Sequence, residues 1–325
     1  MKRILASLIT LALTFALIAP QLAKAQTPIS IAVIGDSLSH EYHCGQNRGA
    51  TAYNWVELLG SLRSVNFGAL VNNCYAYDYA YSGYTIVNQM STMVTNVINN
   101  KSAGNIGRVV ILLGSNDISN GTSTTTMINT YGAQLDRLLA AGFAGSDILT
   151  VAIPQQDCAA SAANANITGF NSQLETLATA KGVQHATYTA FCNALNAYNG
   201  GNVNTSTYNY GGTNIARYTW CQTTCLRIPD GHPGTAAQAI IANSQIAAFL
   251  GVTPLTEAEV LAKMGIGSAP PTNTPTATLT PTITPSPTAT NTPLPTATPT
   301  PIILSCPVGM VWQAIDTRSV RCVSE

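Results

Sequence analysis

Between residues 29 and 250, short apolar runs alternate with longer segments in which apolar residues recur every three or four positions. The short runs predict strands, and the longer segments predict helices with one buried face. The run VVILL, within residues 108–113, is typical of a strand buried on both faces. This alternation predicts an α/β fold with a parallel sheet between helices. The predicted strands are 29–34, 67–71, 108–113, 147–153 and 183–189, and the predicted helices are 53–63, 85–99, 126–141, 167–180 and 235–250.

Two polar peptides that contain glycine follow predicted strands directly. GDS (35–37) ends the first strand, and GSND (114–117) ends the VVILL strand. In parallel sheets, functional groups gather at the carboxyl ends of the strands. These two peptides are therefore the first candidates for a functional site.

Composition divides the rest of the chain. Residues 269–301 are almost entirely Pro, Thr, Ala and Ser, which predicts an extended linker without a core. Residues 302–325 are too few for an ordinary core, so a disulfide between Cys306 and Cys322 is expected to hold this segment together. A small binding module, an attachment segment and a weakly structured end remain open for it. The main domain is then residues 26–268.

The N-terminus is typical of a secretory signal. Lys2 and Arg3 precede an apolar run at 4–18, and AKA (23–25) fits a signal-peptidase site. The run is short for a membrane span, so residues 1–25 are expected to be removed and the protein to be secreted. The remainder carries 11 basic and 14 acidic residues, a net charge of −3. This balance argues against nucleic acid as a partner, since nucleic-acid binders cluster Lys and Arg.

The cysteine count favours disulfides, because the eight cysteines are an even number behind a secretion signal. Zinc is the alternative. However, the chain has no CxxC pair, and Cys221-x-x-x-Cys225 has no matching second pair. If Cys306 and Cys322 pair, the other six cysteines allow several connectivities, among which the sequence does not choose.

Ser37 is the candidate nucleophile. A catalytic serine needs a neutral base, a group that orients the base, and donors for the developing oxyanion. Gly35 lets the chain turn sharply after the first strand, so that the serine can project from the sheet edge. A helix N-cap is the alternative role, since Ser and Asp are favoured caps.

Asn116 and Gly83 are candidate oxyanion donors. The Asn116 side-chain amide follows the VVILL strand, and Gly83 opens the predicted helix at 85–99. A glycine there leaves its backbone N–H facing a ligand, helped by the helix dipole. The alternatives are a cap or Asx turn for Asn116 and a simple turn for Gly83.

His232 is the candidate base, because a neutral imidazole accepts a proton near neutral pH. It lies in the peptide PDGHPG (229–234), with Asp230 two residues before it. A surface loop histidine is the alternative. By contrast, His185 lies in a predicted strand and is expected to be structural.

A compact cluster of polar residues follows Ser37 directly. It could line the pocket or bind a metal, but it lacks the usual ligand spacing, so a pocket-rim role is expected. The cluster consists of His40, Glu41, His43 and Cys44.

Four blocks together resemble the SGNH/GDSL hydrolase family. They are GDSLS (35–39), AYSGYT (80–85), GSND (114–117) and DGHP (230–233), in this order along the chain. The resemblance covers about residues 29–250. It implies a flavodoxin-like three-layer sandwich with a parallel sheet of about five strands, and it implies no metal or organic cofactor.

The resemblance also implies the roles of the site residues. Ser37 would be the nucleophile, His232 the base and Asp230 the orienting acid. The oxyanion hole would consist of the Ser37 N–H, the Gly83 N–H and the Asn116 side chain.

Two positions depart from the family pattern. The family usually places its acid three residues before the histidine, where Pro229 stands here. A backbone carbonyl of residues 221–229 is therefore an alternative to Asp230 as the group that orients His232. Asp78 stands five residues before Gly83, where the family often has Asn.

The sequence therefore predicts a secreted, monomeric serine esterase that hydrolyses a lipid, short-chain or carbohydrate O-acyl ester through a Ser37 acyl-enzyme. The linker and tail suggest contact with a cell surface or polysaccharide. One alternative is an acyltransferase with the same site. Another is a non-catalytic carbohydrate or surface binder, with sugar rings stacked on alternating tyrosines that equally fit a strand with one buried face. The tyrosines are Tyr75, Tyr77, Tyr79, Tyr81 and Tyr84.

Overall fold

The computed structural model divides the chain into two compact units, residues 1–272 and 273–325. The predicted secretion signal and linker lie outside the residues that it describes. None of the described helices is both long and apolar enough to cross a membrane. The described residues are 29–46, 48–154, 158, 165–198, 207–220, 225–267, 310–316 and 319–324.

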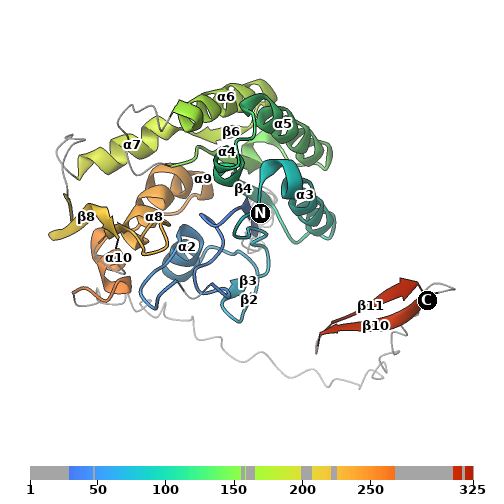
Figure 1. Ribbon diagram of the computed structural model, residues 1–325, viewed down its shortest axis with the longest axis horizontal. Coiled ribbons are helices and arrows are strands. Elements are labelled where there is room, and N and C mark those ends of the chain that lie inside the picture. The colour runs from blue at the N-terminus through green and yellow to red at the C-terminus, as the bar shows by residue number, and fades with distance from the viewer. Residues whose placement is uncertain are drawn as a thin grey trace, which may run out of the picture. The chain divides into compact units, whose positions relative to one another are not determined.

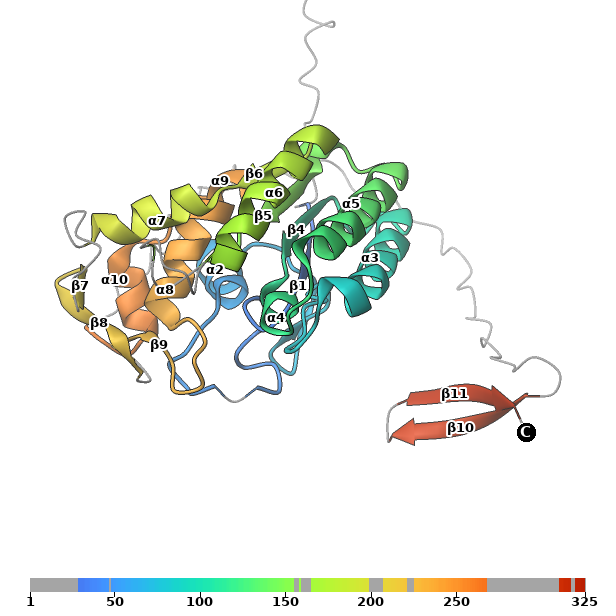
Figure 2. The ribbon, with the colours of Figure 1, turned by 45° about the horizontal axis from the view of Figure 1, so that its top comes forward.

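The centre of the first unit (Figure 1) is a parallel sheet of four strands, labelled in Figure 2, whose order is β1-β4-β5-β6. These strands match four of the five predicted strands, and the α/β fold is confirmed. Their bounds are Ile31–Gly35 (β1), Arg108–Leu112 (β4), Ile148–Val151 (β5) and Gln184–Ala186 (β6).

Successive residues of the inner strands pack into two different cores. In β1, Val33 belongs to one apolar cluster and Ile34 to the other. Each fully buried aliphatic side chain contributes about 1.5–3 kcal/mol. The two helical layers are visible on opposite sides of the sheet in Figure 2. One layer contains α3 (Ile86–Ser102), α5 (Thr124–Ala140) and α6 (Ala165–Lys181), and the other contains α2 (Trp55–Arg63), α7 (Tyr188–Ala197) and α8 (Thr235–Ile241).

The predicted strand at 67–71 is wrong. Only Leu70–Val71 (β2) is extended, and it forms a small antiparallel hairpin with Cys74–Tyr75 (β3). Asn72 and Asn73 both have positive φ, which suits a tight hairpin turn. Leu70 and Val71 are 56% and 61% exposed, so their apolar character does not mark a buried strand.

The tyrosine-rich segment occupies the open edge of the sheet instead. Val33 N–H donates to Tyr77 O, Tyr79 N–H donates to Val33 O, and both bonds are 2.9 Å long. Tyr81 N–H donates to Gly35 O at 3.3 Å. The segment therefore lies beside β1 as an irregular fifth member of the sheet. This position agrees with its interpretation as a strand.

Other predicted helices are confirmed within a few residues, but the last one is interrupted. Residues 235–250 form α8, a π-helical turn (Ala242–Ile246) and α9 (Ala247–Leu250). Sequence analysis missed several short elements. They are α4 (Ser115–Ser119), a 3₁₀ turn (Gly145–Asp147), α7, α10 (Glu257–Lys263), and an outer sheet of β7 (Thr207–Tyr210), β8 (Thr213–Trp220) and β9 (Cys225–Arg227).

Among the described residues of the first unit, two disulfides are formed, Cys44–Cys74 and Cys158–Cys192. In the second unit, β10 (Met310–Asp316) and β11 (Ser319–Ser324) pair as an antiparallel hairpin. Cys306 lies outside the described residues, so the disulfide between Cys306 and Cys322 stays a prediction.

Candidate active site

Ser37 lies in a tight turn at the carboxyl end of β1. A Cβ on Gly35 would lie 2.7 Å from the Cβ of Ser39, so only glycine fits this close approach. The buried Asp36 carboxylate accepts from Leu38 N–H at 3.0 Å, which closes an Asx turn around Ser37. Among the described elements no helix begins at this turn, so the geometry does not support the N-cap role for Ser37.

The GSND block is bonded to the serine turn and to the start of α3. The Ser115 hydroxyl donates to Asp36. The Asn116 amide donates to Tyr84 O at 2.9 Å, which leaves its second N–H for a ligand. The buried Asp117 carboxylate accepts from the N–H groups of Ile86 and Val87 at 2.7 and 3.2 Å. Asp117 therefore caps α3, a role that sequence analysis missed.

The predicted backbone donors of the oxyanion hole make no hydrogen bond to the described part of the protein. Gly83 has a φ of +85°, a conformation that favours glycine. Within the described part of the chain, the N–H groups of Ser37 and Gly83 donate to no protein group. Neither donor is used in the fold, as a site for a developing oxyanion requires.

His232 and Asp230 are in direct contact. Oδ1 of Asp230 lies 3.0 Å from Nδ1 of His232 and also accepts from the His232 backbone N–H at 3.1 Å. An acid two residues before the histidine therefore reaches the ring. Burial lowers the pKa of His232, and the positive charge of Arg48 lowers it further. Both effects favour the neutral ring that a base requires.

The loop that carries His232 lies against the loop that follows Ser37. The Tyr42 hydroxyl donates to Pro233 O at 2.8 Å. From α8, the Gln238 amide donates to Leu38 O at 3.2 Å. However, among the described residues no hydrogen bond joins the Ser37 hydroxyl to the His232 ring. Catalytic hydrogen bonds often tighten only when substrate binds.

Comparison with known families identifies the family of this chain. A family model described as GDSL-like lipase/acylhydrolase matches residues 33–239. The chain belongs to this family. The match spans all four sequence blocks and most of the first unit.

Solved structures resemble this chain only distantly. A psychrotrophic esterase from a Pseudoalteromonas species is 17% identical, with 68% of this chain and 98% of that chain covered and a TM-score of 0.43. A member of the lipolytic G-D-S-L family from Veillonella parvula is 16% identical, with 66% and 94% covered and a TM-score of 0.41. A comparison with curated proteins found no match.

Arg48 is a site residue that sequence analysis missed. Its side chain is only 7% exposed, and its guanidinium contacts Asp230 and the His232 ring. The only available signal was a cation in a glycine-flanked loop after the GDSLS block, in a chain with 9% charged residues.

The residues of the polar cluster after Ser37 have different structural roles. His40 Nδ1 accepts from Ser82 N–H at 3.3 Å, which places His40 beside the Gly83 loop. Cys44 is in a disulfide and cannot serve as a thiolate ligand, although its sulfur lies near His40 and Glu41. His185 lies on β6 with Nδ1 2.8 Å from the Thr150 hydroxyl, in line with a structural role.

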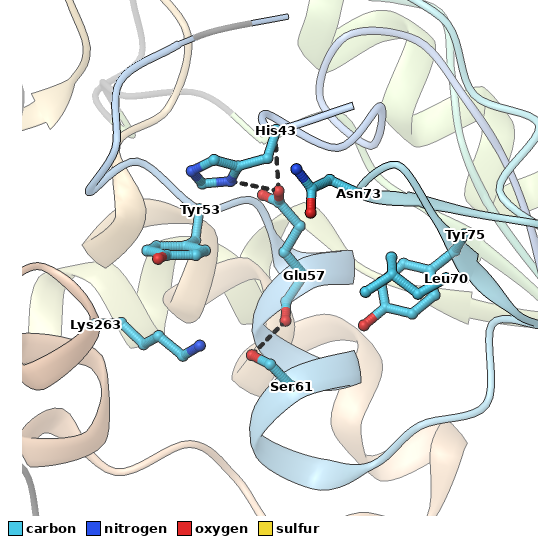
Figure 3. Close-up of a pocket in the computed structure, with 8 residues that line it drawn as sticks. All are labelled: His43, Tyr53, Glu57, Ser61, Leu70, Asn73, Tyr75 and Lys263. Atoms are coloured by element: carbon cyan, nitrogen blue, oxygen red, sulfur yellow. Dashed lines mark hydrogen bonds and ion pairs between the residues drawn. The ribbon is translucent and has the colours of Figure 1, made fainter. Parts of the chain in front are cut away.

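A separate cavity of about 210 Å³ opens beside α2 (Figure 3). His43 Nδ1 lies 2.7 Å from Glu57 Oε1 at its top, and this hydrogen bond raises the pKa of His43. None of the predicted catalytic residues lines this cavity. The lining residues are His43, Tyr53, Glu57, Ser61, Leu70, Asn73, Tyr75 and Lys263.

Glu41 and Asp78 form a buried carboxyl pair between the serine turn and the Gly83 loop. Oδ1 of Asp78 accepts from Ala80 N–H at 2.9 Å, whereas Oδ2 is buried and has no hydrogen-bond donor among the described residues. Burial raises the pKa of both groups, and the negative charge of Glu41 raises the pKa of Asp78 further. The pair therefore resists ionisation in the folded state.

Asp78→Asn is expected to stabilise the protein above about pH 4, and the gain should grow with pH. A carboxyl whose pKa is raised by folding costs stability as the pH rises, whereas an amide cannot ionise. We expect the free energy of unfolding to rise by at least about 1 kcal/mol at neutral pH, measured by urea unfolding at several pH values. Asp136→Asn is the control, because its exposed ion pair with Lys181 contributes only about 0–1 kcal/mol. A gain that is the same at every pH would contradict the raised pKa of Asp78.

Proposed function

We propose that this chain is a secreted serine esterase that cleaves a carboxylic ester through a Ser37 acyl-enzyme. The observation that carries the proposal is a set of hydrogen bonds that joins three of the sequence blocks to one another and the DGHP block to Tyr42, three residues after GDSLS. Ser115 bonds to Asp36, Asn116 bonds to Tyr84, and Tyr42 bonds to Pro233. These bonds support the proposal, because they hold the loops that carry Ser37, Asn116 and His232 against neighbouring parts of the same sheet edge.

The reaction proceeds in two steps. In the first step, His232 takes the Ser37 proton as the hydroxyl oxygen attacks the ester carbonyl carbon. The oxyanion is held by the N–H groups of Ser37 and Gly83 and by the Asn116 amide. His232 then gives its proton to the leaving alcohol, and the acyl group remains on Ser37.

Water completes the second step. His232 removes a proton from water, whose oxygen attacks the acyl carbon. Collapse of the second tetrahedral intermediate releases the carboxylic acid and returns the proton to Ser37. Asp230 holds the ring through Nδ1 and stabilises the imidazolium that forms in both steps.

The disulfides support the secreted part of the proposal. Cys44–Cys74 and Cys158–Cys192 both close within the main domain. Disulfides persist in oxidising compartments and are rare in the cytosol. A secretion signal at residues 1–25 would deliver the chain to such a compartment.

A fluorophosphonate probe tests the nucleophile directly. We expect one covalent adduct on the peptide that contains Ser37, located by mass spectrometry, because the proposed mechanism assigns the base and the oxyanion donors to this serine. Ser37→Ala should abolish labelling. Ser119→Ala, which removes an exposed hydroxyl on α4, should label as the wild type does. Labelling of another serine would reassign the nucleophile.

A further inference from the structure

Arg48 joins two loops that the proposed mechanism uses for different purposes. Nη1 contacts Asp230 and lies 2.6 Å from Nδ1 of His232. Nη2 donates to the Ser82 hydroxyl at 3.2 Å, next to the oxyanion donor Gly83. One guanidinium therefore reaches the base loop and the oxyanion loop.

The surroundings of Arg48 hold the guanidinium in this position. Nη2 also donates to Gln46 Oε1 at 3.1 Å, and the guanidinium carbon lies 5.3 Å from the centre of the Tyr42 ring. Such a cation–π contact contributes about 0.5–2 kcal/mol. A planar group held on three sides is a fixed donor array rather than a mobile surface charge.

The contacts at Nδ1 of His232 compete with one another. Nδ1 donates to Asp230 when it carries a proton, and it accepts from Arg48 when it does not. The first tautomer leaves Nε2 free to take the Ser37 proton, whereas the second does not. The balance between Arg48 and Asp230 therefore determines how well His232 serves as a base.

Two charged groups among the described residues face His232. They are Asp230 on its own loop and Arg48 from the loop after the serine turn. Tyr42 and His40 are titratable groups next to Arg48. Burial is the main cause that lowers the pKa of His40, and the positive charge of Arg48 lowers it further. The cation also opposes protonation of His232, which the Asp230 carboxylate favours.

We propose that Arg48 is a positioning residue that couples the His232 loop to the Gly83 loop and keeps His232 uncharged in mildly acidic conditions. This inference rests on the proposed function, because it assigns a role in the same site. Arg48 contacts the base and not the reacting atoms, so it acts through His232 and Ser82.

The test is the pH dependence of kcat/KM for a soluble p-nitrophenyl ester. In Arg48→Gln, Asp230 attracts a proton to His232 without opposition from the cation. The acid limb of the profile should therefore move to higher pH by about one unit. We also expect kcat to fall about tenfold with little change in KM, because the loss of the anchor between the two loops outweighs the loss of the Arg48 contact that favours the unproductive tautomer.

Two further variants separate charge from coupling. Arg48→Lys keeps the charge, but an ammonium is a point donor that does not reproduce the planar fork. It should lower kcat while the acid limb stays near the wild-type position. Ser82→Ala removes the bond from Arg48 on the oxyanion side, together with the bond of the same hydroxyl to Gln46, and keeps the contacts of Arg48 with Asp230 and His232. It should therefore lower kcat and leave the acid limb unchanged.

Arg63→Gln is the matched control. Arg63 bonds Glu259 at 2.6 Å and anchors two segments outside the site, so its loss should lower Tm without moving the acid limb. An Arg48→Gln profile with a wild-type acid limb would overturn the inference, even if Tm fell. Fluorophosphonate labelling of Ser37 in the same variants keeps the two proposals distinguishable, since labelling tests the nucleophile and the pH profile tests Arg48.

Discussion

Ser37→Ala is expected to lower kcat/KM for a soluble ester on the order of 10⁴-fold or more. The variant keeps the N–H groups of Ser37 and Gly83 and the Asn116 amide, so it still binds the ester and polarises its carbonyl. What it loses is the attacking oxygen, and water without an acyl-enzyme is a poor substitute. The measurement is steady-state hydrolysis of p-nitrophenyl acetate at the pH of maximal activity.

The alanine is not expected to perturb the fold. No described residue makes a hydrogen bond to the Ser37 hydroxyl, so its removal leaves no buried group unsatisfied. The Asx turn around Ser37 depends on the carboxylate of Asp36, which is unchanged. Ser119→Ala should retain wild-type kcat/KM. Substantial activity in Ser37→Ala, with Tm preserved, would show that hydrolysis does not use this serine.

Asp230→Asn is expected to lower kcat at least about tenfold while KM changes little. The carboxylate lies 3.0 Å from Nδ1 of His232 and stabilises the tautomer that leaves Nε2 free for Ser37. An amide presents either a neutral oxygen or an N–H group to Nδ1, and the second option stabilises the unproductive tautomer. The substitution also removes the ion pair with Arg48.

The control for Asp230→Asn is Asp136→Asn, which makes the same chemical change on an exposed helix surface. It should leave kcat and KM unaltered. An unchanged kcat in Asp230→Asn would instead indicate that a backbone carbonyl orients His232 and that the enzyme works as a dyad. Single-turnover kinetics would show whether acylation or deacylation is slowed.

Most of the central domain could be predicted from local pattern, because its strands are buried on both faces. VVILL has no polar position, so it fits only the middle of a covered sheet. Where burial was incomplete, the pattern misled. Leu70 and Val71 are apolar yet exposed, and the edge of the sheet is occupied by alternating tyrosines that lack a continuous apolar run.

The candidate site could be predicted to the extent that its members lie in short peptides with recognisable residue order. Ser37, Asn116 and His232 were assigned in this way, and their roles stay predictions; hydrogen bonds connect their loops through Asp36, Tyr84 and Tyr42. Arg48 and Asp117 were not found as site residues. Arg48 lies in an irregular loop without periodicity, and Asp117 caps a helix that begins 31 positions earlier in the chain.

By itself, the sequence determined which segments are buried strands and helices and which peptides end at the carboxyl edge of the sheet. Local periodicity and turn chemistry depend on neighbouring residues, so they can be read along the chain. Only the tertiary structure decided that Arg48 lies between the base and oxyanion loops and that burial raises the pKa of both Glu41 and Asp78. These contacts join residues far apart in sequence, and their energies depend on burial and mutual distance, which no local pattern contains.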